Sequence, residues 1–297
     1  MRARAGGMAA LLLSPTLLVL GLVVGYPLLA AFRESLYRSG DELDADGFLV
    51  SGDRFVGLDN YADALGSRFW TAFGNTSFFT FTTVAIEVVV GTAMALVMHK
   101  VIRGRGLVRA SILVPWAIPT AVSGLLWRWV FQSDGVANQV LGTDLLWTSD
   151  GWAAKVAVII ADTWKTAPFV GLLVLAGLQL IPAEVNEAAR LDGASAWQRL
   201  WRVTLPLVKP ALLVAVLFRL LDALRMFDLP FVLVGQQKGS VETLSMLAWS
   251  EANQVRYGPA AAYSVILFLY VVLIAFVFVK LLGADLLGER RKKEASV

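Results

Sequence analysis

The chain has 297 residues, of which 57% are hydrophobic and only 16% are charged. This composition is too apolar for an ordinary soluble domain and is typical of integral membrane proteins. The small net charge of +3 gives no reason to expect nucleic-acid binding, because the sequence lacks a soluble basic face with interleaved aromatic residues. The chain has no cysteine, which excludes a disulfide framework.

Six apolar stretches are long enough to cross a bilayer, whose hydrocarbon core of about 30 Å requires about 20 helical residues. We therefore expect an all-α integral membrane protein with six transmembrane helices, in one membrane domain that comprises residues 1–297. The expected spans are residues 9–32, 71–98, 110–131, 152–180, 211–234 and 259–282.

Two of these spans have features beyond their hydrophobicity. The first is expected to remain in the membrane, because its length and its lack of a small-residue cleavage site are unlike those of a signal peptide. Pro115 and Pro119 predict a bend in the third span, because proline lacks the amide hydrogen that a straight helix requires.

The charges of the connecting segments predict an orientation. Segments rich in Lys and Arg stay in the cytoplasm, whereas the acidic connection after the first span can face outward. Both termini and the connection between the fourth and fifth spans are then cytoplasmic. The basic residues on which this prediction depends are Arg2, Arg4, Lys100, Arg103, Arg105, Arg109, Arg290, Arg291, Lys292 and Lys293.

A polar segment, residues 182–210, separates the fourth and fifth spans. It predicts a short helix, a tight glycine turn and a second, amphipathic helix, which together have the form of a docking element. Proline at the first helical position, a capping box and two terminal prolines mark the expected boundaries. These residues are Pro182, Gly193, Ser195, Gln198, Pro206 and Pro210.

This segment resembles the EAA loop of ABC importer permeases. The resemblance lies in Glu187, Ala188, Ala189, Asp192, Gly193, Leu205 and Pro206. It extends over nearly the whole chain, including FVGLDNYADAL at residues 55–65 and WKTAPF at residues 164–169, and is strongest to the maltose/trehalose-type carbohydrate permeases.

The resemblance implies a set of partners. A second homologous permease subunit would share the translocation pathway, and two copies of a cytoplasmic ATPase, with their ATP and Mg²⁺, would drive transport. An extracytoplasmic sugar-binding protein would deliver the substrate. The EAA loop would seat in the ATPase, with Glu187 and Gly193 as its first candidate coupling residues.

The residues themselves argue against an enzyme. His99 is the only histidine, so the chain cannot assemble a histidine-based metal site or catalytic dyad. A phosphate-binding G-x-x-x-x-G-K-[ST] loop is also missing, so ATP hydrolysis requires another polypeptide. We expect no catalytic residue, metal or bound cofactor in this chain.

Polar and ionisable residues within the spans are the candidates for a substrate pathway, because they are costly in lipid. Asp162 and Lys165 suggest either a structural ion pair on one helix face or a pathway lining, and Trp164 is suited to stacking on a sugar ring. Arg219, Asp222, Arg225 and Asp228 predict one polar stripe along the fifth span, facing either a structural network or the substrate. The pathway candidates are Asn75, Trp164, Lys165, Phe169, Asp222 and Asp228.

The expected cargo is a disaccharide of the trehalose or maltose type. Glycerol phosphate or another cargo would need a similar scaffold. An alternative of a different class is an ion-coupled secondary transporter with Asp162, Asp222 and Asp228 as a proton relay. An intramembrane enzyme would need a nucleophile and a base at membrane depth, and the sequence supplies no clear pair.

Overall fold

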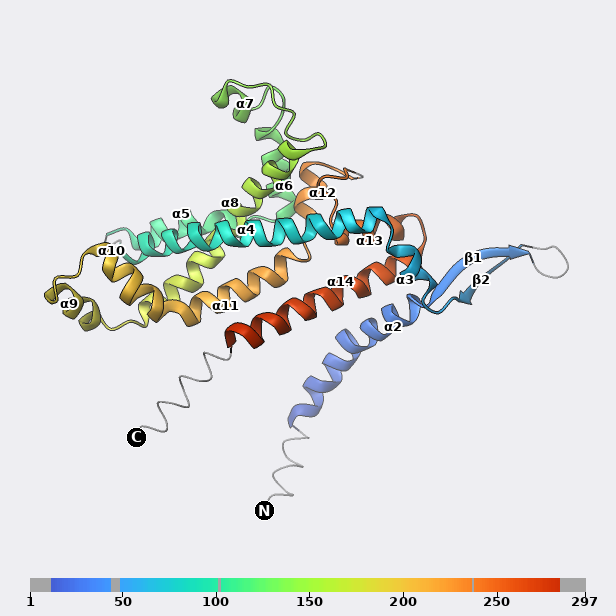
Figure 1. Ribbon diagram of the computed structural model, residues 1–297, viewed down its shortest axis with the longest axis horizontal. Helices are drawn as coiled ribbons and strands as arrows, with labels where there is room; N and C mark the ends of the chain where they lie inside the picture. The colour runs from blue at the N-terminus through green and yellow to red at the C-terminus, as the bar shows by residue number, and fades with distance from the viewer. Residues whose placement is uncertain (1–11, 44–48, 101–102, 237, 284–297) are drawn as a thin grey trace, which may run out of the picture. The chain divides into compact units, whose positions relative to one another are not determined.

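A computed structural model describes residues 12–43, 49–100, 103–236 and 238–283. Helices predominate (Figure 1), and among the described residues five helices are long and apolar enough to span a membrane, or six if one bent pair is a single span. The described residues form two compact units, a smaller one within residues 1–69 and 247–268 and a larger one within residues 70–246 and 269–297. The predicted helical, multi-span fold is confirmed.

The first span continues into a β-hairpin that the sequence analysis did not predict. A helix from Leu12 to Glu34, comprising η1 (Gly21–Gly25) and α2 (Tyr26–Glu34), is followed by the antiparallel strands β1 (Tyr37–Leu43) and β2 (Leu49–Phe55). Helix α3 (Asp59–Ala64) comes next. The buried amide of Asn60 donates to the carbonyl oxygens of Ser35 and Tyr37, and this fixes α3 against the start of the hairpin.

Helix α8 lies at the centre of the larger unit and is buried on several faces. It packs against α5 and α11, and its Gly171 lies so close to Gly91 of α4 that a Cβ would be 3.1 Å from the Gly91 carbonyl oxygen. The remaining helices are α4 (Ser67–Lys100), α5 (Arg105–Ala117), α6 (Thr120–Val130), α7 (Val136–Leu141), α8 (Trp152–Gln179), α9 (Ala183–Leu191), α10 (Ala196–Arg199), η2 (Leu200–Thr204), α11 (Leu205–Ala223), α12 (Asp228–Leu233), α13 (Leu244–Asn253), α14 (Tyr257–Phe278) and η3 (Val279–Gly283).

The third predicted span is two helices and not one. Helices α5 and α6 meet at an angle of 93°. Pro119 causes the break, because the residue before a proline is disfavoured in the helical conformation, and Ile118 is extended, with φ −72° and ψ 132°. The predicted bend is thus present at Pro119, whereas Pro115 lies inside α5.

The predicted fifth span, 211–234, does not correspond to one helix. A continuous helix runs from Ala196 to Ala223, and residues 224–227 separate it from α12. Pro206 and Pro210 do not end the polar segment, because both lie within α11. The π-helical turn η2, in which the Leu205 amide donates to the Leu200 carbonyl, directly precedes Pro206.

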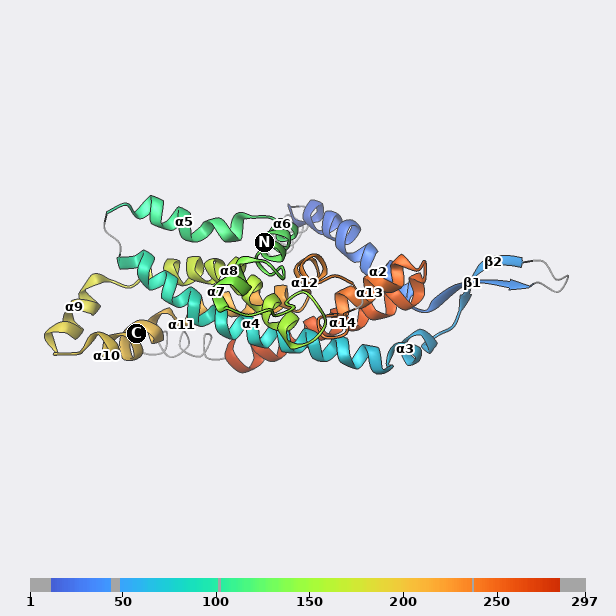
Figure 2. The same ribbon diagram turned by 90° about the horizontal axis from the view of Figure 1, so that it is seen from above.

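One end of the larger unit holds two segments that the charge pattern assigns to the cytoplasm. Helices α9 and α10 extend past the ends of α8 and α11, at the same end where α4 finishes and α5 begins (Figures 1 and 2). The basic residues of both termini lie outside the described residues, so the location of the termini stays a prediction.

Substitution of Gly91 by alanine should lower the midpoint of thermal unfolding in detergent. A Cβ at this position would lie 2.7 Å from the Ala167 carbonyl oxygen and 2.7 Å from the Val170 Cβ. Overpacking of this kind costs about 1–3 kcal/mol. Gly74→Ala on the same helix is the matched control, because a Cβ there meets nothing within 4 Å. Equal midpoints for the two variants would contradict the close α4–α8 contact.

Candidate functional site

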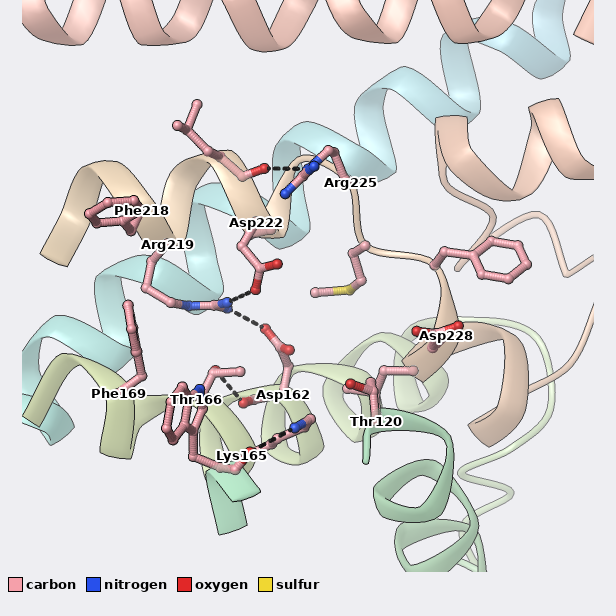
Figure 3. Close-up of a pocket in the computed structure, with 16 residues that line it drawn as sticks. Thr120, Asp162, Lys165, Thr166, Phe169, Phe218, Arg219, Asp222, Arg225 and Asp228 are labelled. Atoms are coloured by element: carbon pink, nitrogen blue, oxygen red, sulfur yellow. Dashed lines mark hydrogen bonds and ion pairs between the residues drawn. The ribbon is translucent and has the colours of Figure 1, made fainter. Parts of the chain in front are cut away.

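The larger unit contains a cavity of about 590 Å³ beside α8 and α11 (Figure 3). It lies where α11 ends, where α6 and α12 begin and where α5 breaks. Its aromatic lining residues are Trp116, Phe169, Phe218 and Phe227. Its charged lining residues are Asp162, Lys165, Arg219, Asp222, Arg225 and Asp228.

Arg219 is the centre of a buried ion cluster at one wall of this cavity. Its Nε donates to Oε2 of Glu87 at 2.6 Å, and its Nη2 donates to Oε1 of Glu87 at 2.9 Å. Nη2 also contacts Oδ2 of Asp162 at 3.2 Å, and Nη1 binds Oδ2 of Asp222. The cluster joins α4, α8 and α11. The contact with Glu87 is a bidentate guanidinium–carboxylate pair, which is stronger than a single hydrogen bond.

Glu87 is a functional candidate that the sequence analysis missed. Its side chain is fully buried and also accepts a hydrogen bond of 2.6 Å from the Thr166 hydroxyl of α8. The sequence did contain an indication, because Glu87 is the only charged residue within the predicted span 71–98. A lone carboxylate at membrane depth requires a buried partner.

Lys165 does not pair with Asp162, as the sequence analysis had suggested it could. Its Nζ donates to the carbonyl oxygen of Ile118 at 2.8 Å and weakly to that of Trp116 at 3.4 Å, while Asp162 contacts Arg219. The break at Pro119 deprives these carbonyls of helical partners, and an apolar environment makes an unpaired carbonyl costly. Lys165 therefore stabilises the break between α5 and α6.

The predicted charged stripe of the fifth span is divided between two helices. Arg219 and Asp222 lie on α11, Arg225 follows the end of that helix and donates to the Leu221 carbonyl, and Asp228 begins α12. All four nevertheless line the same cavity. The break in the chain, and not helical periodicity, brings them together.

Three other pathway candidates occupy different environments. Phe169 lines the cavity and lies 5.6 Å, centroid to centroid, from the ring of Trp116. Trp164 is partly exposed and packs edge-on against Trp127. Asn75 is buried and binds the carbonyl oxygens of Gly239 and Glu242, so its amide holds a connecting segment against α4.

The polar segment has the local structure that its sequence predicts. Gly193 has a φ of +76°, and Ser195 and Gln198 form a capping box at the start of α10. Pro182 is the N-cap of α9 and not its first helical residue. Of the predicted coupling residues, Glu187, Ala188, Asp192, Gly193 and Pro206 are exposed, and Ala189 and Leu205 are half-buried.

A multi-span helical bundle with a broken helix beside a cavity lined by charged residues is an architecture found in membrane transport proteins. Residues 87–287 match the family model described as "binding-protein-dependent transport system inner membrane component". The chain belongs to this family, and it is a multi-pass inner-membrane transport component.

The chain is similar to curated transport proteins along most of its length. It is 38% identical to the trehalose/maltose transport system permease protein MalF of Thermococcus litoralis, covering 91% of this chain and 92% of the relative. It is 40% identical to the trehalose transport system permease protein SugA of Mycobacterium tuberculosis, covering 93% and 89%.

The fold is also found among solved structures. One chain of a bacterial ABC transporter involved in the import of the polysaccharide alginate superimposes with a TM-score of 0.77. The match covers 94% of this chain and 97% of that chain, at 19% identity. At this identity the likeness concerns the fold alone.

Replacing Glu87 by leucine should strongly destabilise the larger unit, because Arg219 would lose its paired carboxylate in a buried environment. Removal of one partner from a buried ion pair costs about 3–5 kcal/mol. Thr83→Val, one turn earlier on α4, is the matched control, because the Thr83 hydroxyl is buried and has no hydrogen-bond partner within the described residues. Thermal unfolding in detergent separates the two variants, and a Glu87→Leu protein as stable as Thr83→Val would show that the cluster contributes no stability.

Proposed function

We propose that this chain is the membrane subunit of an ATP-driven importer of a disaccharide of the trehalose or maltose type. The names of two relatives, which are 38% and 40% identical over most of the chain, carry this proposal. A second homologous permease completes the pathway, and two copies of a cytoplasmic ATPase bind and hydrolyse MgATP. An extracytoplasmic binding protein delivers the sugar.

The cavity beside α8 and α11 is the proposed sugar site. Its volume of about 590 Å³ lies within the range of small-molecule sites. Phe169 and Trp116 offer aromatic faces for the apolar side of a sugar ring, and the exposed carboxylates of Asp222 and Asp228 accept hydrogen bonds from hydroxyl groups. These groups suit an uncharged polyol.

The same geometry disfavours a proton relay through Asp162, Asp222 and Asp228. Asp162 and Asp222 both contact the guanidinium of Arg219. Through its contact with Arg219, Asp162 links α8 to α11, and Glu87 links α4 to the same guanidinium. The ion cluster is therefore better suited to holding helices together than to carrying protons.

The polar segment, with α9 at its exposed end, is the proposed docking element for the ATPase. Gly193 makes the turn between α9 and α10, and α10 continues through η2 and α11 as one helix up to Ala223. A displacement of the segment therefore moves the helix that lines the cavity. This continuity is a physical route for coupling between ATP binding and the sugar site.

The direct test is sugar-stimulated ATP hydrolysis by the complete transporter in lipid nanodiscs. Trehalose or maltose should stimulate hydrolysis. Glu187→Ala and Gly193→Val should reduce the stimulation about fivefold or more, which is the lower end of ordinary coupling effects. Valine at position 193 would be strained at a φ of +76°.

Gly106→Ala is the control, because a Cβ there meets nothing within 4 Å and its φ is ordinary. Wild-type stimulation in both loop variants would contradict the docking role. Stimulation by glycerol phosphate in place of either disaccharide would contradict the cargo. Proton-driven uptake without ATP would contradict the transporter class.

A further inference from the structure

The ion cluster of Arg219 connects the proposed sugar site with the helix that begins in the polar segment. We propose that Arg219 is a positioning residue that holds Asp222 in its ligand-accepting orientation, and that Glu87 fixes Arg219 for this purpose. The inference rests on the proposed function of the cavity as a sugar site. It assigns distinct roles to the residues of the cluster.

The inner side of Arg219 is rigidly held. Its side chain is 3% exposed and that of Glu87 is 0% exposed, with two hydrogen bonds between them and a third from Thr166 to Glu87. Helices α4 and α8 therefore determine the position of the guanidinium. An alternative position would leave the buried Glu87 carboxylate without its cation, which is costly.

On the side away from Glu87, Arg219 contacts Asp222, which lines the cavity. The Asp222 side chain is 66% exposed, compared with 8% for Asp162 and 0% for Glu87. Asp162 also lines the cavity, but Asp222 is by far the most exposed carboxylate of the cluster and the most accessible to a ligand (Figure 3). One of its oxygens binds Arg219, and within the described residues its second oxygen, Oδ1, has no hydrogen-bond donor.

A carboxylate with one oxygen fixed and the other open is a preorganised acceptor for a hydroxyl group. Its rotamer is selected before the ligand arrives, so less conformational entropy is lost on binding. Asp228, which also lines the cavity, has no bond to Arg219 within the described part of the chain, and its orientation does not depend on the cluster.

The contacts of Arg219 differ in how they respond to movement of α11. Arg219 and Asp222 are three residues apart on that helix, so their contact moves with it. The contacts with Glu87 on α4 and Asp162 on α8 cross to other helices. A rotation or translation of α11 must therefore strain or break the cross-helix bonds and carry Asp222 with it.

Asp222 lies at the opposite end of a long helix from the polar segment. The helix is continuous from Ala196 to Ala223, and Arg219 lies about 35 Å along it from Ala196 at the ordinary helical rise. Movement of the polar segment would change the Arg219–Glu87 contact and, with it, the orientation of Asp222. Sugar affinity is thereby linked to the position of the docking element.

A double-mutant cycle on the apparent KM for the stimulating disaccharide tests the proposal in the complete transporter. Arg219→Lys should raise KM, because one ammonium group cannot hold Glu87 at two points and Asp222 as well. Asp222→Asn should raise KM about tenfold, as expected when a hydrogen bond to a charged carboxylate is replaced by one to a neutral amide. The double variant should be no worse than the more affected single variant.

Asp228→Asn provides the matched cycle. Its effect on KM should multiply with that of Arg219→Lys, because Asp228 acts on the ligand independently of Arg219. The proposal would be overturned if the effects of Arg219→Lys and Asp222→Asn on KM multiplied in the double variant. It would also be overturned if Asp222→Asn had the wild-type KM. A purely structural cluster would lower the amount of folded transporter and leave KM unchanged, which would also overturn it.

Glu87→Gln keeps the size of the side chain and its acceptor for Thr166, and it replaces Arg219→Lys in the cycle if the latter fails to assemble. Its effect should likewise not multiply with that of Asp222→Asn. Hydrolysis by the wild type that no disaccharide stimulates would refute the proposed function itself, and this inference with it. If a disaccharide stimulates hydrolysis by the wild type but the effects of the two substitutions on KM multiply, only the positioning role is refuted.

Discussion

A charged guanidinium held in a membrane-spanning bundle is the constraint on which the rest of the structure depends. A charge at the centre of a bilayer costs about 2.5–3.5 kcal/mol even on permissive scales. Arg219 avoids this cost by contacting Glu87, Asp162 and Asp222, which lie on three helices, α4, α8 and α11. The helices must therefore meet at this point, and the polar cavity lies directly beside it.

The break between α5 and α6 obeys the same rule for the backbone. Pro119 ends helical hydrogen bonding, and Lys165 supplies a donor to the carbonyl oxygens that lose their partners. At these two places the irregular backbone and the charge face protein or a cavity, as an apolar bilayer requires. Lys165 and Arg219 line the same cavity. The residues that stabilise the fold in the membrane therefore also form the polar wall of the proposed binding site.

The sequence predicted the regular parts of the fold well. The fourth span was placed within one residue of α8, and the capping box and glycine turn of the polar segment followed from local backbone chemistry. Helix breaks were harder, because residues 224–234 are mostly apolar apart from Arg225 and Asp228, and in composition they continue the apolar stretch of α11. Hydrophobicity reports burial in lipid or protein and does not distinguish one long helix from two short ones.

The partners of charged residues were harder still. Spacing along one helix suggested an Asp162–Lys165 pair, whereas the structure pairs Asp162 with Arg219, 57 residues away. Glu87 is alone in its span and its partner lies 132 residues further along the chain, so no spacing along one helix indicated this pair. Such pairs depend on how helices pack. By contrast, the charges that line the cavity were recognised individually, since an ionisable residue in an apolar span stands out whatever it contacts.

A cryo-electron microscopy structure of the assembled transporter, purified with trehalose or maltose, would test the central claim most directly. We expect density for the disaccharide in the cavity, with a hydroxyl group at Asp222 and with Arg219 still bound to Glu87. Sugar density confined to another part of the pathway, or an Arg219 side chain turned away from both carboxylates while the sugar is bound at Asp222, would contradict it.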